Sequence, residues 1–288
     1  MRHALSIDVE DWFHPEALRG VVRREDWERL EPRAGRNVER LLRLLDGAQV
    51  RATFFVLGWV AENEPRLVPR LAAEGHEVAS HGWAHDMITR QEAHEFEADL
   101  CRSLEVLRAQ SGQPIVGYRA PSFSIVRGTL WALDVLLEHG MTYDSSIFPV
   151  RHDRYGIPGA PREPYRVARR GERELWELPP VTMRCLGRNL PAAGGGYLRL
   201  MPYSLSALAL RRLESEGRPG VVYTHPWEYD PEQPRLPLPR PRAVRHYAGI
   251  GGTEAKLARL LREFSFTTCR EVLDSVRVPA RAAELVPA

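Results

Sequence analysis

Two histidines, His81 and His85, stand four residues apart just after a short apolar segment. Imidazole is the commonest side-chain ligand of transition metals, and this spacing lets two rings converge on one ion when the segment is helical or tightly turned. Two histidines need a third ligand, for which a carboxylate is the natural candidate. The alternative interpretation is that both rings make ordinary hydrogen bonds in a loop or at the start of a helix.

Carboxylates that suit this role follow the first apolar segment, where Asp8, Glu10 and Asp11 fall within four residues. Like charges this close raise at least one carboxyl pKa unless a cation intervenes, and a divalent ion resolves the conflict. Because side chains alternate along a strand, residues 8 and 10 share one face, which favours Glu10 as the ligand. A bend at the strand end would present Asp11 instead. The alternative for the whole group is a solvated loop with acidic caps.

Two further polar residues follow expected strands. Arg119 comes after the short segment 117–118, and its permanently charged guanidinium suits a carboxylate partner. His225 comes after residues 221–224, which places it at the same strand ends as the other polar residues. The alternatives are a surface arginine, in a chain rich in arginine, and a histidine that makes only a structural hydrogen bond.

Short apolar segments alternate with helical patterns along most of the chain, which predicts an α/β fold of parallel strands joined by crossover helices. Roughly seven such units would close a barrel, whose active site lies at the carboxyl ends of its strands. We expect glycines 47, 75 and 140 to be left-handed C-caps. The expected strands are residues 4–9, 52–57, 77–80, 117–118, 175–178 and 221–224, and the expected helices are residues 36–46, 65–74, 92–111, 129–139 and 204–216.

Two stretches interrupt this alternation. Residues 149–173 are rich in proline, glycine and arginine, and residues 231–242 contain five prolines, so both are expected to be irregular surface loops. The second is expected to be an extended arm of polyproline type, followed by an amphipathic helix at 253–264. We therefore predict one barrel domain over residues 1–230 and a C-terminal extension over residues 231–288 that packs on the same domain.

The composition excludes several classes of function. Lysine and arginine total 40 against 38 aspartates and glutamates, so no nucleic-acid footprint is indicated. The single lysine, Lys256, is expected on an exposed helix, which argues against Schiff-base catalysis. Three separated cysteines indicate neither a disulfide framework nor a cysteine-based zinc site. Without an export signal or a membrane-spanning segment, we expect a cytoplasmic protein, or one at the periphery of a membrane-bound polysaccharide synthesis system.

Taken together, the motifs give the chain a resemblance to polysaccharide deacetylases, the carbohydrate esterases with a NodB-type domain. The resemblance covers roughly residues 1–230. It is greatest to the branch with peptidoglycan deacetylases and allantoinase-like hydrolases and, in the tail, to deacetylases of bacterial exopolysaccharide and exosortase systems. The motifs are, in chain order, Asp8-Val9-Glu10, Thr53-Phe54-Phe55-Val56, His76-Glu77-Val78-Ala79-Ser80-His81-x-x-x-His85, Tyr118-Arg119-Ala120-Pro121, Tyr143-Asp144-Ser145-Ser146 and Thr224-His225-Pro226-Trp227.

The resemblance implies a distorted (β/α)7 barrel with one divalent metal, usually zinc, that acts on an N-acetylated glycan. It implies His81 and His85 as metal ligands, completed by Glu10 or Asp11. In this family the residue matching Asp8 is the catalytic base. The usual pattern carries an aspartate where this chain has Glu10.

For the remaining motifs the resemblance implies that Arg119 holds Asp8 as a carboxylate. His225 would protonate the departing amine, with Asp144 as its orienting partner. The aromatic residues beside these motifs are expected either to stack on sugar rings or to pack in the core. They are Trp12, Trp83, Tyr118 and Trp227.

Two other functions fit the same pattern. The first is hydrolysis of a small cyclic amide, as in the allantoinase-like relatives, and the second is carbohydrate binding without catalysis. A closed pocket would favour the first, whereas an open groove favours a polysaccharide. Loss of base or ligand residues would favour the second, and apart from Glu10 no such loss is seen.

Overall fold

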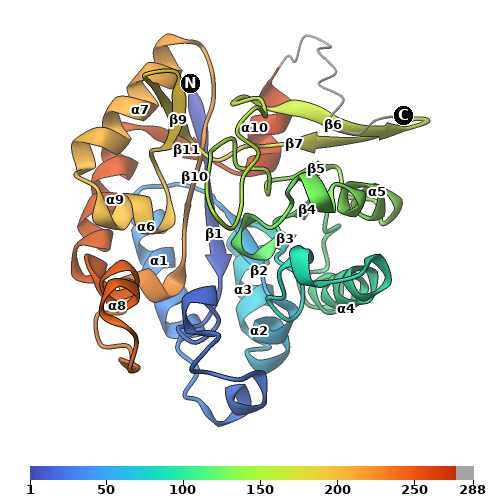
Figure 1. Cartoon of the computed structure of the whole chain (residues 1–288), viewed down its shortest axis with the longest axis vertical. Coiled ribbons are helices and arrows are strands. Elements are labelled where there is room, and N and C mark those ends of the chain that lie inside the picture. Colours follow the sequence, from blue (N-terminus) through green and yellow to red (C-terminus); the bar gives the residue numbers. More distant parts are fainter. Residues whose placement is uncertain (277–288) are drawn as a thin grey trace.

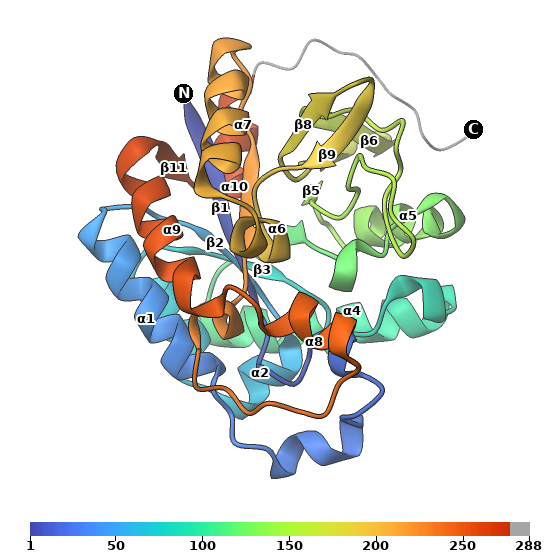
Figure 2. The ribbon, with the colours of Figure 1, turned by 60° about the vertical axis from the view of Figure 1, so that its left-hand side comes forward.

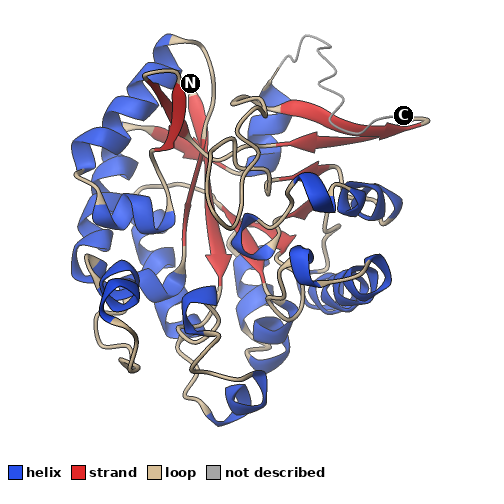
Figure 3. Cartoon of the chain, in the orientation of Figure 1, coloured by secondary structure: helices blue, strands red, loops and turns tan. Residues whose placement is uncertain are grey.

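A mostly parallel sheet forms the centre of the computed structural model, which describes residues 1–276 (Figures 1 and 3). Its strands are β1 (Arg2–Val9), β2 (Thr53–Val56), β3 (Glu77–Ser80), β4 (Gly117–Tyr118), β5 (Tyr143–Asp144), β6 (Tyr165–Arg170), β7 (Arg173–Glu177), β10 (Val221–Thr224) and β11 (Ser265–Thr267). They follow the order β10-β1-β2-β3-β4-β5-β7-β6, and β11 also pairs with β1. β6 is antiparallel to β7, and the other pairs are parallel.

The expected α/β order is confirmed, but the strand ladder does not close into a continuous barrel within the described residues. Single backbone bridges join Pro180 to Val221 and Gly194 to Tyr223 across the gap between β7 and β10. Two prolines, Pro179 and Pro180, follow β7 after the single residue Leu178. Because proline has no N–H to donate to a ladder, regular pairing ends there.

Helices surround the sheet, as the two views show (Figures 1 and 2). None of those within residues 1–276 combines the length and apolarity needed to cross a membrane. The α-helices are α1 (Ala34–Gly47), α2 (Gly58–Asn63), α3 (Leu67–Ala73), α4 (Ala93–Ser111), α5 (Trp131–Glu138), α6 (Gly195–Leu200), α7 (Tyr203–Ser215), α8 (Arg240–Tyr247), α9 (Ile250–Glu263) and α10 (Cys269–Ser275). Short 3-10 turns are η1 (Glu16–Leu18), η2 (Arg24–Arg29), η3 (Ile88–Arg90), η4 (Pro121–Phe123), η5 (Arg127–Thr129) and η6 (Pro226–Tyr229).

The alternation of side chains along β1 positions the functional residues. Leu5, Ile7 and Val9 point to the main apolar core between the sheet and the helices, where each contributes roughly 1.5–3 kcal/mol on burial. The residues between them face the other side of the strand, and among them Asp8 is also buried. One face of β1 therefore anchors the strand in the core while the opposite face carries polar groups into the site.

Two expectations about local structure were wrong, and one hairpin was not expected. Gly47 is the last residue of α1 rather than a left-handed cap, because the chain continues to a positive φ at Gln49, whereas Gly75 and Gly140 do have positive φ. The region 149–173 is not wholly irregular, since it contains β6, which forms a hairpin with β7. A second hairpin, β8 (Thr182–Cys185) with β9 (Arg188–Pro191), had no clear apolar alternation to predict it.

The region after residue 230 packs closely on the rest of the chain. β11 pairs with β1, and α9 buries Leu257, Leu260 and Leu261. The proline-rich segment leads into α8, which runs across the front of the molecule in Figure 2. The division of the chain at residue 230 stays a prediction. The last part of the predicted C-terminal extension, residues 277–288, lies outside the described residues.

Lys256 is not an exposed helix residue. Its Nζ donates to the carbonyl oxygens of Leu198, Arg199 and Met201, at 3.0, 2.8 and 2.8 Å, and so closes the carboxyl end of α6.

We expect Lys256→Met to lower the free energy of unfolding by about 1–3 kcal/mol, because buried carbonyl groups lose a charged donor. Urea denaturation measures the effect. Arg262→Met, an exposed position on the same helix, is the matched control and should change stability by less than about 0.5 kcal/mol. Equal effects of the two substitutions would contradict the capping role.

Candidate metal centre

Three side chains converge where β1 and β3 end. The ligand atoms of Glu10, His81 and His85 all lie within 4.8 Å of one another, and all three residues are buried. Glu10 Oε1 lies 3.3 Å from His81 Nε2 and 3.1 Å from His85 Nε2. One carboxylate and two imidazoles are a donor set typical of zinc sites that keep a coordination position open.

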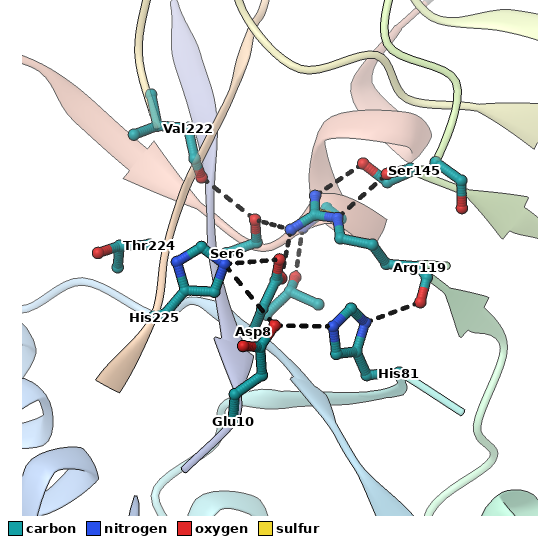
Figure 4. A network of polar contacts seen from close by, with 12 residues as sticks. Ser6, Asp8, Glu10, His81, Arg119, Ser145, Val222, Thr224 and His225 are labelled. Atoms are coloured by element: carbon teal, nitrogen blue, oxygen red, sulfur yellow. Dashed lines mark hydrogen bonds and ion pairs between the residues drawn. The ribbon is translucent and has the colours of Figure 1, made fainter. Parts of the chain in front are cut away.

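The hydrogen bonds of His81 fit metal binding. Its Nδ1 lies 2.8 Å from the carbonyl oxygen of Arg119, which can only accept, so Nδ1 carries the proton. Nε2 then presents a lone pair toward Glu10 (Figure 4). A cation between these two electron-pair donors relieves their repulsion, and a carbonyl behind the ligating ring is the usual means of orienting it.

The loop that carries the histidines has a strained backbone. Gly82 and His85 both have positive φ, 75° and 56°, and for a residue other than glycine this is uncommon. Asp99 of α4 holds the loop, because its two carboxylate oxygens accept from the N–H groups of Trp83 and Ala84 at 2.8 and 3.0 Å. Sequence reasoning missed Asp99, since nothing in a helical pattern marks which acid contacts a distant loop.

Asp11 does not join the cluster. Its carboxylate accepts hydrogen bonds from the N–H groups of Trp12, Arg33 and Ala34, at 2.8, 2.7 and 3.0 Å. These contacts hold the start of α1, where N–H groups have no partner within the helix. Of the two carboxylates that the sequence left as alternatives, the structure brings only Glu10 to the histidines.

Asp8 lies beside the cluster and is paired with Arg119. Arg119 is fully buried and donates from Nη1 to Asp8 Oδ1 at 2.6 Å and to Ser6 Oγ at 2.7 Å. Its other nitrogens donate to the carbonyl oxygen and hydroxyl of Ser145 on the far side (Figure 4). The guanidinium is thus fixed at both ends, and its hydrogen bond orients the Asp8 carboxylate.

His225, which directly follows β10, faces the carboxylates of Asp8 and Glu10. Its Nε2 lies 3.8 Å from both Asp8 Oδ2 and Glu10 Oε1, and its Nδ1 lies 3.1 Å from Glu228 Oε2. Burial lowers the pKa of His225, but the charges of Glu10 and Glu228 raise it to about 9 overall. Glu228 in turn accepts from Nε of the buried Arg199 at 3.1 Å.

The partner of His225 is therefore Glu228 and not Asp144. Asp144 lies on β5, where its side chain accepts from the Ser146 hydroxyl and faces Glu177 of β7. Glu228 follows His225 by three residues in η6, so one turn of chain brings its carboxylate to the imidazole and to the His225 N–H. An acidic residue at this offset was the available signal for it.

Asp144 and Glu177 form a buried pair of carboxyl groups on neighbouring strands. Burial raises the pKa of Asp144 to about 6, and burial together with the nearby Asp144 charge raises the pKa of Glu177 well above its ordinary value. Above pH 4.5 the unfolded chain releases the Glu177 proton that the folded chain keeps, so this group destabilises the fold increasingly as the pH rises.

Glu177→Gln removes this penalty and still accepts from the Ile147 N–H. We expect the variant to gain stability relative to the natural chain between pH 5 and pH 8, by up to about 1.4 kcal/mol per pH unit. Urea denaturation at the two pH values measures the difference. A difference that does not change with pH would show that Glu177 is ionised in the folded chain.

The aromatic residues beside the motifs divide between two roles. Trp12, Trp83 and Tyr118 belong to the apolar core. Trp227 is also buried, but its Nε1 lies 3.3 Å from Glu10 Oε2 and its ring stacks beside His225, with ring centroids 5.2 Å apart. It therefore orients the carboxylate of the cluster.

A cavity opens over the site. A small pocket of about 100 Å³ is lined by Asp8, Glu10, His85 and His225. It shares Ser122, Phe123, His225 and Trp227 with a cavity of about 1270 Å³, which is larger than the roughly 300–1,000 Å³ typical of small-molecule sites. The carboxylates and imidazoles thus adjoin this larger cavity, which we call the groove.

A carboxylate and two histidines at the strand ends of an α/β sheet are an arrangement typical of metal-dependent hydrolases. Comparison with known proteins shows which family the chain resembles. Residues 31–143 match the model described as "Polysaccharide deacetylase", and residues 145–274 match "Domain of unknown function (DUF3473)". The similarity to polysaccharide deacetylases thus covers residues 31–143 of the chain.

Individual relatives agree with this assignment. A chitooligosaccharide deacetylase of Bradyrhizobium sp. (strain ANU 289) is 33% identical over 96 residues, which are 33% of this chain and 42% of the relative. The chain thus spans about two fifths of the length of the curated relatives that it matches. A putative polysaccharide deacetylase from Mycobacterium smegmatis has a similar fold, with a TM-score of 0.65 at 21% identity over 96% of this chain and 90% of the other. The PuuE allantoinase has a TM-score of 0.64 at 14% identity over 95% and 89%.

The site crosses both matched regions. His81, His85 and Arg119 lie in the deacetylase region, whereas His225 and Glu228 lie in the DUF3473 region. The second region therefore supplies two side chains that lie beside the cluster of Glu10, His81 and His85.

Proposed function

We propose that the chain is a metal-dependent hydrolase that removes N-acetyl groups from an amino-sugar polysaccharide or oligosaccharide. The observation that carries the proposal is the position of Asp8, fixed by Arg119 at 2.6 Å beside the cluster of Glu10, His81 and His85. The curated relatives are named as deacetylases of chitooligosaccharides and peptidoglycan, which supports the same substrate class for this chain.

Glu10, His81 and His85 would hold the ion, for which zinc is the candidate that the donor set suits best. A divalent ion in such a site supplies Lewis-acid polarisation of the acetyl carbonyl and lowers the pKa of water. Asp8 takes the proton of the attacking water as general base, and Arg119 holds Asp8 in the correct orientation.

His225 acts from the opposite side of the site. Its Nε2 faces Asp8 and Glu10, and Glu228 holds its Nδ1. We assign to it the transfer of a proton to the sugar nitrogen as the C–N bond breaks, which gives acetate and a free amine. A role in exopolysaccharide synthesis is part of this proposal and rests on the motifs of the tail.

The second candidate is hydrolysis of a small cyclic amide, because the fold is also similar to that of the PuuE allantoinase. At 14% identity this likeness concerns the fold alone. The groove of about 1270 Å³ favours an extended glycan over a small ureide, which would fill only part of it.

The two candidates separate in one experiment. The zinc-loaded protein is incubated with N-acetylglucosamine oligomers and, in parallel, with allantoin, and acetate release and ring opening are measured. We expect acetate from the oligomers and no ring opening. Ring opening without acetate would favour the cyclic-amide hydrolase, and neither product would favour a binding protein without catalysis.

A further inference from the structure

Three exposed arginines line the large groove next to the site. Arg154 lies in the loop after β5, and Arg242 and Arg245 lie in α8. No carboxylate of residues 1–276 lies within ion-pair distance of these three side chains. This contrasts with arginines such as Arg33 and Arg36, which both pair with Asp230.

The groove carries more arginines than carboxylates. Its lining holds five arginines and two acidic residues, Glu16 and Asp153, and Glu16 pairs with Arg90. The groove therefore keeps an excess of positive charge. Arginine is well suited to carboxylate and phosphate groups, because its planar fork donates two parallel hydrogen bonds.

Contacts bring the arginines together from separate segments. Nη2 of Arg245 lies 3.2 Å from Nε2 of His152, and the backbone N–H of Arg154 donates to Nδ1 of the same ring at 3.2 Å. Burial lowers the pKa of His152, Asp153 raises it, and Arg245 and Arg154 lower it further.

Arg242 also lies beside the loop that follows η1. Nη1 of Arg242 lies 3.9 Å from the point that a Cβ of Gly20 would occupy, so α8 reaches that loop at the groove's edge. Tyr155 stacks on His152 with ring centroids 3.8 Å apart, and its hydroxyl lies 3.0 Å from that of Tyr197. Aromatic faces of this kind pack against the C–H faces of sugar rings. One groove thus combines aromatic side chains with an excess of arginines.

We propose that the groove binds an anionic group of the glycan substrate, a sugar carboxylate or a phosphate, through Arg154, Arg242 and Arg245. The inference rests on the proposed function, since it names the chemical class of the molecule whose N-acetyl group reaches Asp8. The arginines act on binding alone, because they line the groove and not the small pocket around Asp8 and Glu10.

The test compares three substrates by acetate release and, separately, by calorimetric binding. They are a neutral N-acetylglucosamine tetramer, a tetrasaccharide that alternates N-acetylglucosamine with glucuronate, and UDP-N-acetylglucosamine. We expect one anionic substrate to have a KM roughly 10- to 100-fold below that of the neutral tetramer, as charge-assisted hydrogen bonds supply. Which one it is distinguishes the carboxylate from the phosphate. Its KM should rise with salt, since ions screen exposed charges.

The double variant R242Q/R245Q should raise the KM of the anionic substrate roughly 10-fold or more, without changing its kcat or the kinetics of the neutral tetramer. Arg43→Gln is the matched control, an exposed arginine of α1 away from the groove. Equal KM values for neutral and anionic substrates, unaffected by the double variant, would overturn the inference and leave the deacetylase proposal intact. Arginine-dependent binding without acetate release from any substrate would instead contradict the deacetylase proposal and leave the anion site intact.

Discussion

The variant Asp8→Asn is expected to keep its metal and to release acetate roughly 10²- to 10⁴-fold more slowly than the natural chain. Asparagine has nearly the same shape as aspartate and still accepts from Arg119 through its amide oxygen, but it does not take a proton. Because Asp8 is not among the three clustered ligand residues, metal content should stay near that of the natural chain. Initial rates with an N-acetylglucosamine oligomer and metal analysis of the same sample measure both effects.

Asp144→Asn is the matched control for this prediction. Asp144 is an equally buried carboxyl group, but it contacts Ser146 and Glu177 and not the cluster or His225. We expect its deacetylation rate to stay within a few-fold of the natural rate. Full activity in Asp8→Asn, or loss of metal as complete as in His85→Ala, would contradict the assignment of Asp8 as the base.

The second large effect concerns the neighbouring carboxylates Glu10 and Asp11. Glu10→Gln should weaken zinc binding by more than the roughly 10- to 100-fold that is typical of residues behind the ligands. Asp11→Ala should leave zinc affinity unchanged and lower the free energy of unfolding by about 0.5–2 kcal/mol, because three N–H groups near the start of α1 lose their acceptor. Competition with a chelator of known affinity measures the first effect and urea denaturation the second.

Each of these two variants serves as the control for the other. Both remove one buried carboxylate from the same turn of chain, so a general loosening would affect zinc affinity equally. Zinc loss in Asp11→Ala together with retention in Glu10→Gln would show that Asp11 is the ligand.

The sequence alone was sufficient for those parts of the site that depend on periodicity. Alternation along β1 placed Asp8 and Glu10 on one face, and the strand-end rule placed Arg119 and His225 beside them. The order of strands and helices likewise predicted the parallel sheet. These features are local, or follow from a general property of parallel sheets, and need no knowledge of particular distant contacts.

The parts that could not be predicted depend on contacts between distant segments. Asp11 could not be recognised as the residue that holds α1, because Arg33 is far along the chain. The helical pattern predicts an exposed Lys256, because it does not show that the carbonyl oxygens at the end of α6 lie against the Lys256 ammonium group. The Glu228 partner of His225 is local, but the family resemblance directed attention to Asp144 instead. Resemblance transfers a role to a position, whereas the structure decides which side chain makes the contact.

The region that matches DUF3473 supplies residues to both the site and the groove. It contributes His225 and its partner Glu228 to the site, and through α8 it contributes Arg242 and Arg245 to the groove. We infer that metal binding depends on Glu10 and on His81 and His85 of the deacetylase region, whereas the second region supplies the proton donor and substrate selection.

Metal-dependent deacetylation is tested most directly by acetate release from an N-acetylglucosamine oligomer, measured on one preparation in two states. The protein is first freed of metal by a chelator and assayed, and one equivalent of zinc is then returned and the assay repeated. We expect no acetate above background in the first state and sustained release in the second, with zinc bound at one ion per chain. Equal release in both states, or no release with zinc fully bound, would contradict a metal-dependent deacetylase.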